Sequence, residues 1–318
     1  MLKIGAVGHK NHAGKVLDIV NDSKLGGVEY VYHPDKLVNH PRATQNLEDL
    51  YSCDVIFILS PDHTHFEYLE LFSNNFNGYI FCEKPPAVSL FELKKLKTFD
   101  RKRIFFNFNL RYSQLALKIN DVLTSGQLGK VLHIDAVTTH GLAFSKKYIS
   151  SWRGDNHNNG DNIVMTKSIH YVDLLVRMLG QPDQLNLHFS SGANQSHLSD
   201  TCNVFLAYNE GPTGSVFASY AAPYNDRLFI YGTNGQLEYD GNKLLYLGPR
   251  DTFDSSGRYE MAPSTTLTEF SSSSMWTDSL RNSVIYFLNA VNNKVALDDF
   301  FESSIVTTRL LLGEVCKK

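Results

Sequence analysis

The sequence has few cysteines and no long apolar run, and both absences narrow the class of protein. Its four cysteines show no CxxC spacing; they are Cys53, Cys82, Cys202 and Cys316. Cys53 and Cys82 lie in or beside apolar runs that are typical of buried, reduced thiols. No apolar run approaches the ~20 residues that a membrane-spanning helix needs. We therefore expect a cytoplasmic protein that neither enters a membrane nor is secreted.

The sequence also has little net charge, which is −3 from 30 basic and 33 acidic residues. Its densest basic cluster, residues 94–103, lies on a short amphipathic segment and is typical of a solvated helix face. Nucleic-acid binding favours an extended basic stripe. We expect no nucleic-acid partner.

The first part of the chain alternates apolar runs with amphipathic segments. The runs are Leu2–Val7, Val28–Tyr32, Asp54–Ser60, Tyr79–Cys82 and Ile104–Asn109. Between them, His65–Phe76 and Ser89–Leu96 carry apolar residues at three- and four-residue spacing, which is typical of helices that cover a sheet. This α/β alternation predicts a Rossmann domain with a doubly wound parallel sheet over residues 1–115.

After Gly129 longer strands joined by hairpin turns replace this alternation. The predicted strands are Val131–Thr139, Leu185–Ser190, Asn203–Tyr208, Gly214–Ala221, Leu228–Tyr231 and Gln236–Tyr239. Turns such as Asn234-Gly235 suit tight antiparallel hairpins. We predict helices over Asp161–Leu179, Ser279–Val291 and Phe300–Leu312, and a loop over 262–274. Residues 116–318 thus read as an α+β domain with a large, mainly antiparallel open sheet, and its terminal helix, about 300–315, can pack back on the first domain.

The stretch KIGAVGHKNHAGKV, residues 3–16, has the strand, glycine turn and helix start of a dinucleotide-binding loop. Aligning GxGxxG/A at Gly8 places Lys10 at the second glycine and Ala13 at the third. Lys10 adds a side chain where the backbone should approach a pyrophosphate, although its ammonium can meet the phosphate itself. The predicted cofactor contacts in this loop are Gly8, His9, Lys10, Asn11, His12 and Ala13.

The end of the second predicted strand lacks the acid that binds the ribose hydroxyls of NAD. It reads Tyr32-His33-Pro34-Asp35-Lys36. His33 and Lys36 can meet a 2′-phosphate, which favours NADP over NAD. The alternative is an ordinary polar loop.

The stretch FCEKPPAVS, residues 81–89, places Lys84 directly after a buried strand. Such a lysine is either a solvated strand end or a charge directed into a cleft. Ligands gather at the carboxyl ends of the strands in an open α/β sheet. The residues that fall at such ends are Gly8, His9, Ser60–His65 and Glu83–Pro85. This convergence favours a Lys84 charge that is directed into a cleft over a solvated strand end.

Two of these stretches, LSPDHTH and FCEKPPAVS, resemble signatures of the Gfo/Idh/MocA oxidoreductase family. The resemblance continues in family order through FNLRY, SGQLGKV, WRGD, IHYVDLLVRMLGQP and IYGTNGQLEY. It implies hydride transfer between NAD(P) and a hydroxyl or carbonyl carbon of a sugar, sugar derivative or cyclitol. The pair Arg111 and Arg153 is suited to carboxylate or phosphate groups, which favours a nucleotide-activated or acidic sugar. It also implies a homo-oligomer, dimer or tetramer, formed through the carboxyl-terminal sheet.

The family resemblance assigns roles to individual residues. Lys84 and His170 are the implied catalytic pair, and the Lys84–Pro85 peptide is expected to be cis. Further cofactor contacts fall on Ser60, Pro61, His63, His65, Glu83, Pro85 and Lys84 itself. Substrate contacts fall on Arg111, Trp152, Arg153, Thr166, Lys167 and His170.

One position departs from the family pattern. Many members carry an aspartate four residues before the helical histidine, where this chain has Thr166. Threonine cannot act as a carboxylate base. Lys167 can bind an anionic substrate or replace part of the proton relay, and the alternative is a solvated helix residue.

Four histidines near one predicted sheet edge, His9, His12, His63 and His65, raise the question of a metal site. The family resemblance offers no metal, and we expect none.

The leading functional hypothesis is therefore an NAD(P)-dependent sugar dehydrogenase. The departures at Lys10 and Thr166 keep two alternatives open. One is a non-catalytic sensor or scaffold that retains the fold. The other is a lyase or glycosidase that uses transient oxidation by NAD.

Overall fold

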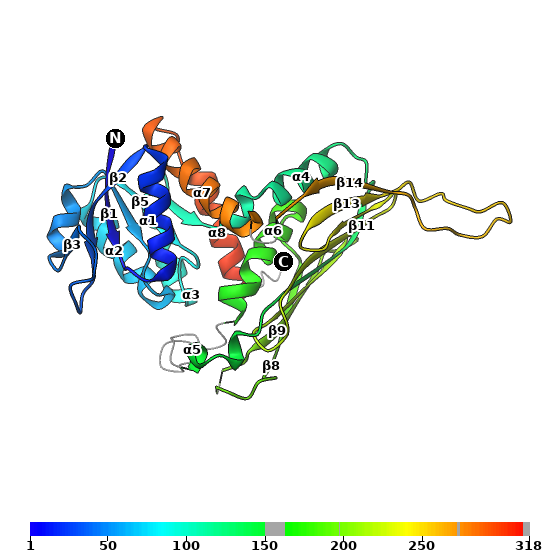
Figure 1. Ribbon diagram of the computed structural model, residues 1–318, viewed down its shortest axis with the longest axis horizontal. Helices are drawn as coiled ribbons and strands as arrows, with labels where there is room; N and C mark the ends of the chain where they lie inside the picture. The colour runs from blue at the N-terminus through cyan, green and yellow to red at the C-terminus, as the bar shows by residue number, and fades with distance from the viewer. Residues whose placement is uncertain (150–162, 197, 272–273, 314–318) are drawn as a thin grey trace. The chain divides into compact units, whose positions relative to one another are not determined.

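The computed structural model describes residues 1–149, 163–196, 198–271 and 274–313 (Figure 1). The chain divides into two compact units. The first comprises Met1–Asn109 and Leu280–Glu314, and the second comprises Leu110–Ser279. None of the described helices combines the length and apolar content needed to cross a bilayer.

The first unit is built on a six-stranded parallel sheet with the order β3-β2-β1-β4-β5-β6. This is the strand order of a Rossmann fold, so the predicted doubly wound sheet is confirmed. The strands are β1 (Leu2–Val7), β2 (Gly26–Tyr32), β3 (Ala43–Thr44), β4 (Val55–Ile58), β5 (Tyr79–Glu83) and β6 (Ile104–Asn107). The helices are α1 (Asn11–Ser23), α2 (His65–Asn75), α3 (Leu90–Leu96), α8 (Asp298–Leu311) and α7 (Ser274–Asn292), whose residues before Leu280 belong to the second unit. This unit also contains the short 3-10 turns η1 (Leu47–Ser52) and η2 (Asp62–Thr64).

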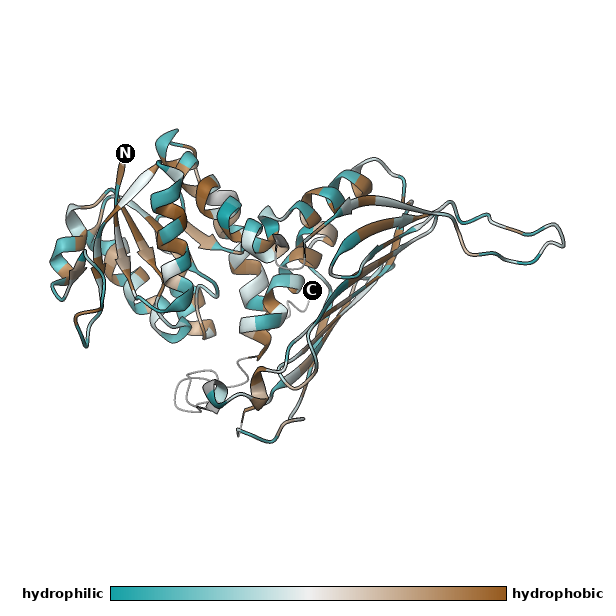
Figure 2. Cartoon of the chain, viewed as in Figure 1, coloured by the Kyte–Doolittle hydropathy of each residue, from teal (hydrophilic) through white to brown (hydrophobic). Residues whose placement is uncertain are grey.

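The core of this unit follows from strands that are apolar on both faces. All four residues of β4 and all four of β6 are buried, as a sheet covered on both sides requires. Figure 2 shows the apolar residues concentrated along these strands and on one side of the covering helices. The rings of Phe57 and Phe81 stack at 4.5 Å, and Phe287 of α7 packs against both. Phe301 of α8 contacts Phe106 of β6 at 5.2 Å.

The second unit is built on an eight-stranded sheet with the order β14-β13-β12-β11-β7-β10-β9-β8. Its strands are β7 (Val131–Thr139), β8 (Gln184–Ser190), β9 (Thr201–Ala207), β10 (Thr213–Ser219), β11 (Asn225–Gly232), β12 (Gln236–Tyr239), β13 (Lys243–Leu247) and β14 (Ser264–Glu269). β10 pairs in parallel with β7, and the other neighbouring strands of this sheet pair antiparallel. The predicted mainly antiparallel sheet is confirmed.

Helix α6 (Ile169–Leu179) covers this sheet, accompanied by α4 (Gln114–Thr124), η4 (Leu142–Phe144) and α5 (Lys146–Ile149) in the same unit. A Cβ on Gly214 of β10 would lie 2.8 Å from Leu175, so glycine there lets the helix approach the strand closely. The helix ends at Gly180, whose φ of +83° favours glycine, as predicted.

The structure corrects two details of the sequence prediction. The predicted loop over 262–274 contains strand β14, an edge strand that pairs with β13 through its backbone and buries little side-chain surface. The helix predicted from Asp161 has a π-helical turn, η6 (Val164–Ser168), before α6, and residues 161 and 162 lie outside the described residues. π-helical turns inside α-helices are frequent at functional sites.

Candidate functional site in two parts

The loop after β1 has the backbone that a dinucleotide-binding turn requires. Gly8 has a φ of +97°, and a Cβ there would lie 2.9 Å from the carbonyl oxygen of Leu59. Its amide donates to the carbonyl of Tyr32 at the end of β2. Ala13 is buried in the first turn of α1. The two positions that need small residues therefore have them.

The amino terminus of α1 can receive an anion. Its N-cap residue Lys10 makes no side-chain capping bond, and its first turn carries no acidic residue. The first amides of the helix can therefore meet a phosphate, which the helix dipole also favours. Lys10 has an extended backbone and an exposed side chain, so lysine fits without strain and adds a cation. These residues fit the pyrophosphate of a nicotinamide dinucleotide.

A buried carboxylate lies beside this loop. Nε2 of His12 contacts Oε1 of Glu83 at 2.9 Å, and Asn107 donates to the same oxygen at 2.7 Å. The charge of Glu83 raises the pKa of His12, against the opposing effect of burial. Burial raises the pKa of Glu83, but the charge of His12 and hydrogen bonds from His12 and Asn107 outweigh it and hold that pKa below its usual value. Both directions favour an ion pair at mildly acidic to neutral pH.

The strand ends that carry the predicted cofactor contacts lie side by side. Val7 pairs with Ile58 and Ile58 with Cys82, so the loops after β1, β4 and β5 share one sheet edge. Lys84 follows β5 at this edge, and its side chain is half-buried. The Lys84–Pro85 peptide is cis, as the family resemblance implied.

His65 joins two of these loops. Its Nδ1 lies 2.8 Å from the carbonyl oxygen of Pro85, and its Nε2 lies 2.9 Å from that of Ser60. Carbonyl oxygens only accept hydrogen bonds, so the ring makes both bonds when each nitrogen carries a hydrogen. His65 is buried, and these contacts fix the backbone around Lys84 rather than present the ring to a ligand. Ser60, Pro61 and His63 are half-buried along the same edge.

The loop after β2 gathers several basic side chains. His33 is half-buried and Lys36 is exposed. The rings of His9 and His40 meet edge to face at 5.3 Å. Burial, with the nearby charge of His9, lowers the pKa of His40. Sequence inspection had singled out His33, Lys36 and His9 but missed His40.

In the second unit, Thr166 and His170 lie on consecutive helical segments, η6 and α6. The hydroxyl of Thr166 shares a hydrogen bond of 2.5 Å with the hydroxyl of Tyr220. The ring of His170 meets Trp276 edge to face at 5.1 Å, and Nζ of Lys167 lies 5.9 Å from the centroid of the same indole. Thr166, Lys167 and His170 are all half-buried.

Arg111, predicted as a substrate contact, has a structural role in this unit. Its Nε and Nη2 donate to Oδ2 and Oδ1 of Asp173 at 2.7 and 2.6 Å, and both side chains are buried. A forked pair of this kind uses two of the five N–H donors of the guanidinium and fixes its plane. Trp152 and Arg153, the other predicted substrate contacts, lie outside the described residues.

No group of three or more histidine, cysteine or acidic side chains that could hold a metal ion occurs among the described residues. Of the four histidines considered for one, His12 contacts Glu83 and His65 contacts two carbonyls.

Family models match both units. Residues 5–104 match the model described as an oxidoreductase family with an NAD-binding Rossmann fold, and residues 116–238 match the GFO/IDH/MocA C-terminal domain. The chain belongs to the Gfo/Idh/MocA family.

Relatives within this family are distant. The uncharacterized oxidoreductase YrbE of Bacillus subtilis is 25% identical over 202 residues, which are 60% of this chain and 56% of YrbE. The dehydrogenase aclE of Aspergillus oryzae is 24% identical over 189 residues, 52% of this chain and 51% of aclE. The chain thus spans about half the length of these curated relatives.

Solved structures share the fold of this Gfo/Idh/MocA chain. A levoglucosan dehydrogenase in complex with NADH and levoglucosan has a TM-score of 0.79 at 16% identity, covering 99% of this chain and 96% of that one. A myo-inositol dehydrogenase from Corynebacterium glutamicum has a TM-score of 0.74 at 16% identity, covering 98% and 94%.

Sequence inspection of this family member missed three polar groups near the site. Asn107 lies at the end of the apolar strand β6, Asp226 lies at the start of β11, and Trp276 follows a serine-rich stretch. A polar residue at a buried strand position is a usable signal. The partners of Asn107 and Asp226, however, lie 24 to 176 residues away in the chain.

Proposed function

We propose that the chain is an NAD(P)-dependent dehydrogenase or reductase that acts on a CH–OH group of a sugar, sugar derivative or cyclitol. The observation that carries the proposal is the placement of Lys84 on the same sheet edge as the Gly8 loop. A bound nicotinamide would accept or supply the hydride. The Gly8 loop, the first turn of α1 and the loop after β4 would hold the dinucleotide. The levoglucosan and myo-inositol dehydrogenases that share the fold support a polyhydroxylated substrate.

The chain's own residues supply the proton chemistry in this proposal. An ammonium or amine at Lys84 can take up or deliver the proton of the reacting hydroxyl. His65 holds the loops after β4 and β5 through its contacts with the backbone carbonyls of Ser60 and Pro85. His170 is the second proton-transfer group, on the substrate side.

We further propose a preference for NADP. β2 ends at Tyr32 without an acid, and the loop after it carries Asp35 together with the basic residues His33, Lys36, His40 and Arg42. Arg42 pairs with Glu29 at 3.7 Å. Nδ1 of His33 accepts from the amide of Asp35, and Nδ1 of His40 accepts from that of Arg42, so each ring has Nε2 left as a donor. Basic donors at this position suit a 2′-phosphate.

Titration of the purified protein with NADPH and with NADH, followed by nicotinamide fluorescence, tests both the cofactor and its type. We expect saturable binding of both and a roughly tenfold lower Kd for NADPH, equivalent to about 1.4 kcal/mol. Lys36→Met should remove most of that preference, and Lys3→Met, at the opposite end of β1, should leave it unchanged. Tighter NADH binding would contradict the NADP preference. Absence of binding by any nicotinamide dinucleotide would favour the sensor or scaffold alternative. Turnover without net redox change would favour the lyase or glycosidase.

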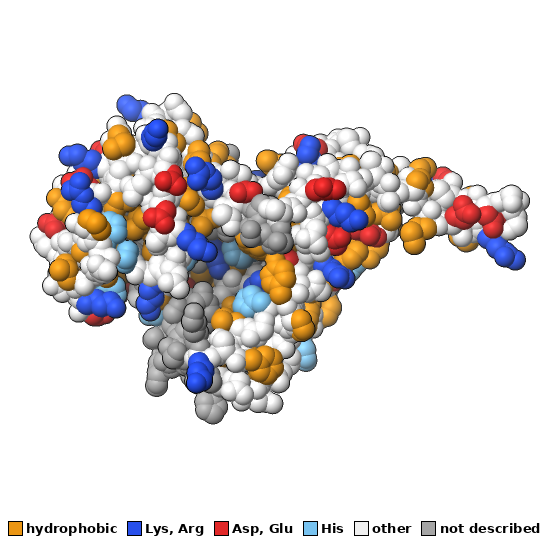
Figure 3. Space-filling model, viewed as in Figure 1, with side chains coloured by type: hydrophobic (Ala, Val, Ile, Leu, Met, Phe, Trp, Pro, Cys, Tyr) orange, Lys and Arg blue, Asp and Glu red, His pale blue; other side chains and the backbone are white. Residues whose placement is uncertain are grey.

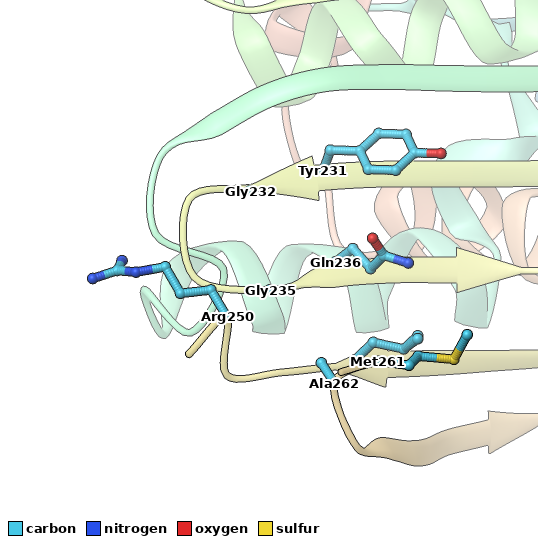
Figure 4. A pocket seen from close by; sticks show the side chains of 8 residues that line it. Tyr231, Gly232, Gly235, Gln236, Arg250, Met261 and Ala262 are labelled. Carbon is cyan, nitrogen blue, oxygen red and sulfur yellow. The ribbon is translucent and has the colours of Figure 1, made fainter. Parts of the chain in front are cut away.

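We also propose that the chain forms a homo-oligomer through the open face of its eight-stranded sheet. That face carries aromatic side chains, with Phe205 49% and Tyr231 38% exposed. A pocket of about 300 Å³ opens beside Tyr231, between the β11–β12 hairpin and the arm of residues 248–263 (Figure 4). The arm, which joins β13 to β14, exposes Tyr259 and Met261.

Light scattering after gel filtration tests this surface. We expect a mass of two or four times 35.9 kDa for the wild type and a shift towards 35.9 kDa for Phe205→Glu. Phe91→Glu is the matched control, since Phe91 is an exposed aromatic residue of α3 in the first unit. A monomeric wild type, or equal effects of both variants, would contradict the proposal.

Two observations bear on the setting of this function. Cys53, Cys82 and Cys202 are buried thiols, which suits the reducing cytoplasm that we propose as the compartment. On the face shown in Figure 3, lysine and arginine side chains are scattered among acidic and apolar ones.

A further inference from the structure

The second unit contains a buried carboxylate that the proposed chemistry does not use. Asp226 of β11 is 2% exposed. Its Oδ1 accepts a hydrogen bond from the hydroxyl of Tyr171 at 2.7 Å, and its Oδ2 accepts one from Nε1 of Trp276 at 2.6 Å. Burying a carboxylate is costly unless hydrogen bonds and a positive charge compensate it. The buried carboxylate of Asp226 therefore needs a positive charge nearby.

Lys167 provides that charge. Burial lowers the pKa of Lys167, and the negative charge of Asp226 opposes that effect. Burial raises the pKa of Asp226, while its hydrogen bonds to Tyr171 and Trp276 and the charge of Lys167 oppose that effect. The charge of each group thus opposes the effect of burial on the pKa of the other.

The ammonium of Lys167 remains open to a ligand. It makes no hydrogen bond to another described residue, and its Nζ lies over the indole of Trp276. The carboxylate of Asp226 acts on Lys167 through its charge, and the three N–H donors of Lys167 have no hydrogen-bond partner among the described residues. The ring of His170 packs edge to face against the same indole. An ammonium held beside the predicted catalytic histidine is suited to an anionic oxygen.

We propose that Lys167 is a specificity-determining residue that binds an anionic substituent, a carboxylate or phosphate, on the sugar-like substrate, and that Asp226 and Trp276 are positioning residues for it. This inference rests on the proposed function, because it takes the ligand at His170 to be the substrate.

Matched pairs of charged and neutral ligands test the proposal by isothermal titration calorimetry, which needs no turnover. Wild-type protein with saturating NAD⁺ or NADP⁺ is titrated with glucuronate and galacturonate against their neutral amides, and with glucose 6-phosphate against glucose. We expect the wild type to bind at least one anionic member of a pair about tenfold more tightly than its neutral partner, about 1.4 kcal/mol. The pair that shows the preference distinguishes carboxylate from phosphate.

Variants then assign the preference to Lys167. Lys167→Met should abolish it while the affinity for the neutral partner stays within about twofold, and Lys167→Arg should restore much of it. Asp226→Asn should reduce the preference, provided that the variant melts like the wild type. Tyr171→Phe removes one hydrogen bond to Asp226 and gives the same test with a smaller structural change. Lys130→Met, an exposed lysine of the same unit, is the control and should have no effect.

The outcomes separate this inference from the proposed function. Equal binding of charged and neutral partners by the wild type, or a preference that survives in Lys167→Met, overturns the inference and leaves the dehydrogenase proposal standing. Failure of every sugar, charged and neutral, to bind or turn over overturns both.

Discussion

Replacing Lys84 by methionine is expected to abolish turnover while the affinity for NAD(P) stays within several-fold of the wild type. Methionine keeps much of the length and apolar volume of the side chain but cannot carry a proton. Positioned acid–base groups contribute about 10²–10⁴-fold to a reaction, so kcat/KM should fall by about that factor. The cofactor affinity should survive because the Gly8 turn and the first amides of α1, which would bind the pyrophosphate, do not depend on the Lys84 ammonium.

The measurement combines steady-state kinetics, on whichever sugar shows turnover, with fluorescence titration of NADPH. Lys97→Met is the matched control, since Lys97 is exposed at the end of α3, and its kinetics should equal those of the wild type. Turnover by Lys84→Met within tenfold of wild type would show that the role given to Lys84 is wrong. A collapse of NADPH affinity would instead make Lys84 a cofactor-binding residue.

The parallel sheet could be predicted because its strands are buried on both faces. The runs Leu2–Val7 and Tyr79–Cys82 coincide with β1 and with most of β5, and their apolar character arises from the same burial that defines the sheet. Gly8 and Gly180 were also recognisable, since a positive φ leaves glycine as the favoured residue at both positions. Local chemistry of this kind is visible in one sequence.

Strand β14 escaped prediction for a physical reason. It is an edge strand whose serine and threonine side chains are mostly exposed, so its pairing with β13 depends on backbone hydrogen bonds and leaves no apolar alternation. β-branched threonines were the remaining signal, and the surrounding serines obscured it.

The polar contacts of the site were beyond prediction because they join distant parts of the chain. His12 and Glu83 are 71 residues apart, and Trp276 and Asp226 are 50 apart. The dinucleotide-binding loop made His12 a predicted cofactor contact and the family resemblance did the same for Glu83, whereas the fold pairs them with each other. Asp226 had no such resemblance to draw attention to it.

Replacing Arg111 by methionine is expected to produce a large loss of stability. The guanidinium and the carboxylate of Asp173 are 3% and 1% exposed, so the substitution leaves Asp173 as a buried charge without this partner. Breaking a buried pair in this way costs about 3–5 kcal/mol. At about 2–4 °C per kcal/mol for a unit of this size, the Tm of the second unit should fall by roughly 6–20 °C. Differential scanning calorimetry, which can resolve separate transitions, is the measurement.

Two further variants separate the cost of losing the Arg111 partner from the net value of the pair. Arg101→Met breaks an exposed ion pair with Glu302 and should change the Tm by no more than a few degrees, since such pairs contribute about 0–1 kcal/mol. The double variant Arg111→Met with Asp173→Leu removes both charges and should recover much of the loss, because apolar replacements of a buried pair are often neutral. A double variant as unstable as Arg111→Met would show that the bidentate geometry itself, rather than the stranded carboxylate, holds α6 in place. An Arg111→Met protein that melts like the wild type but loses affinity for substrate would return Arg111 to the substrate-binding role that the family resemblance suggested.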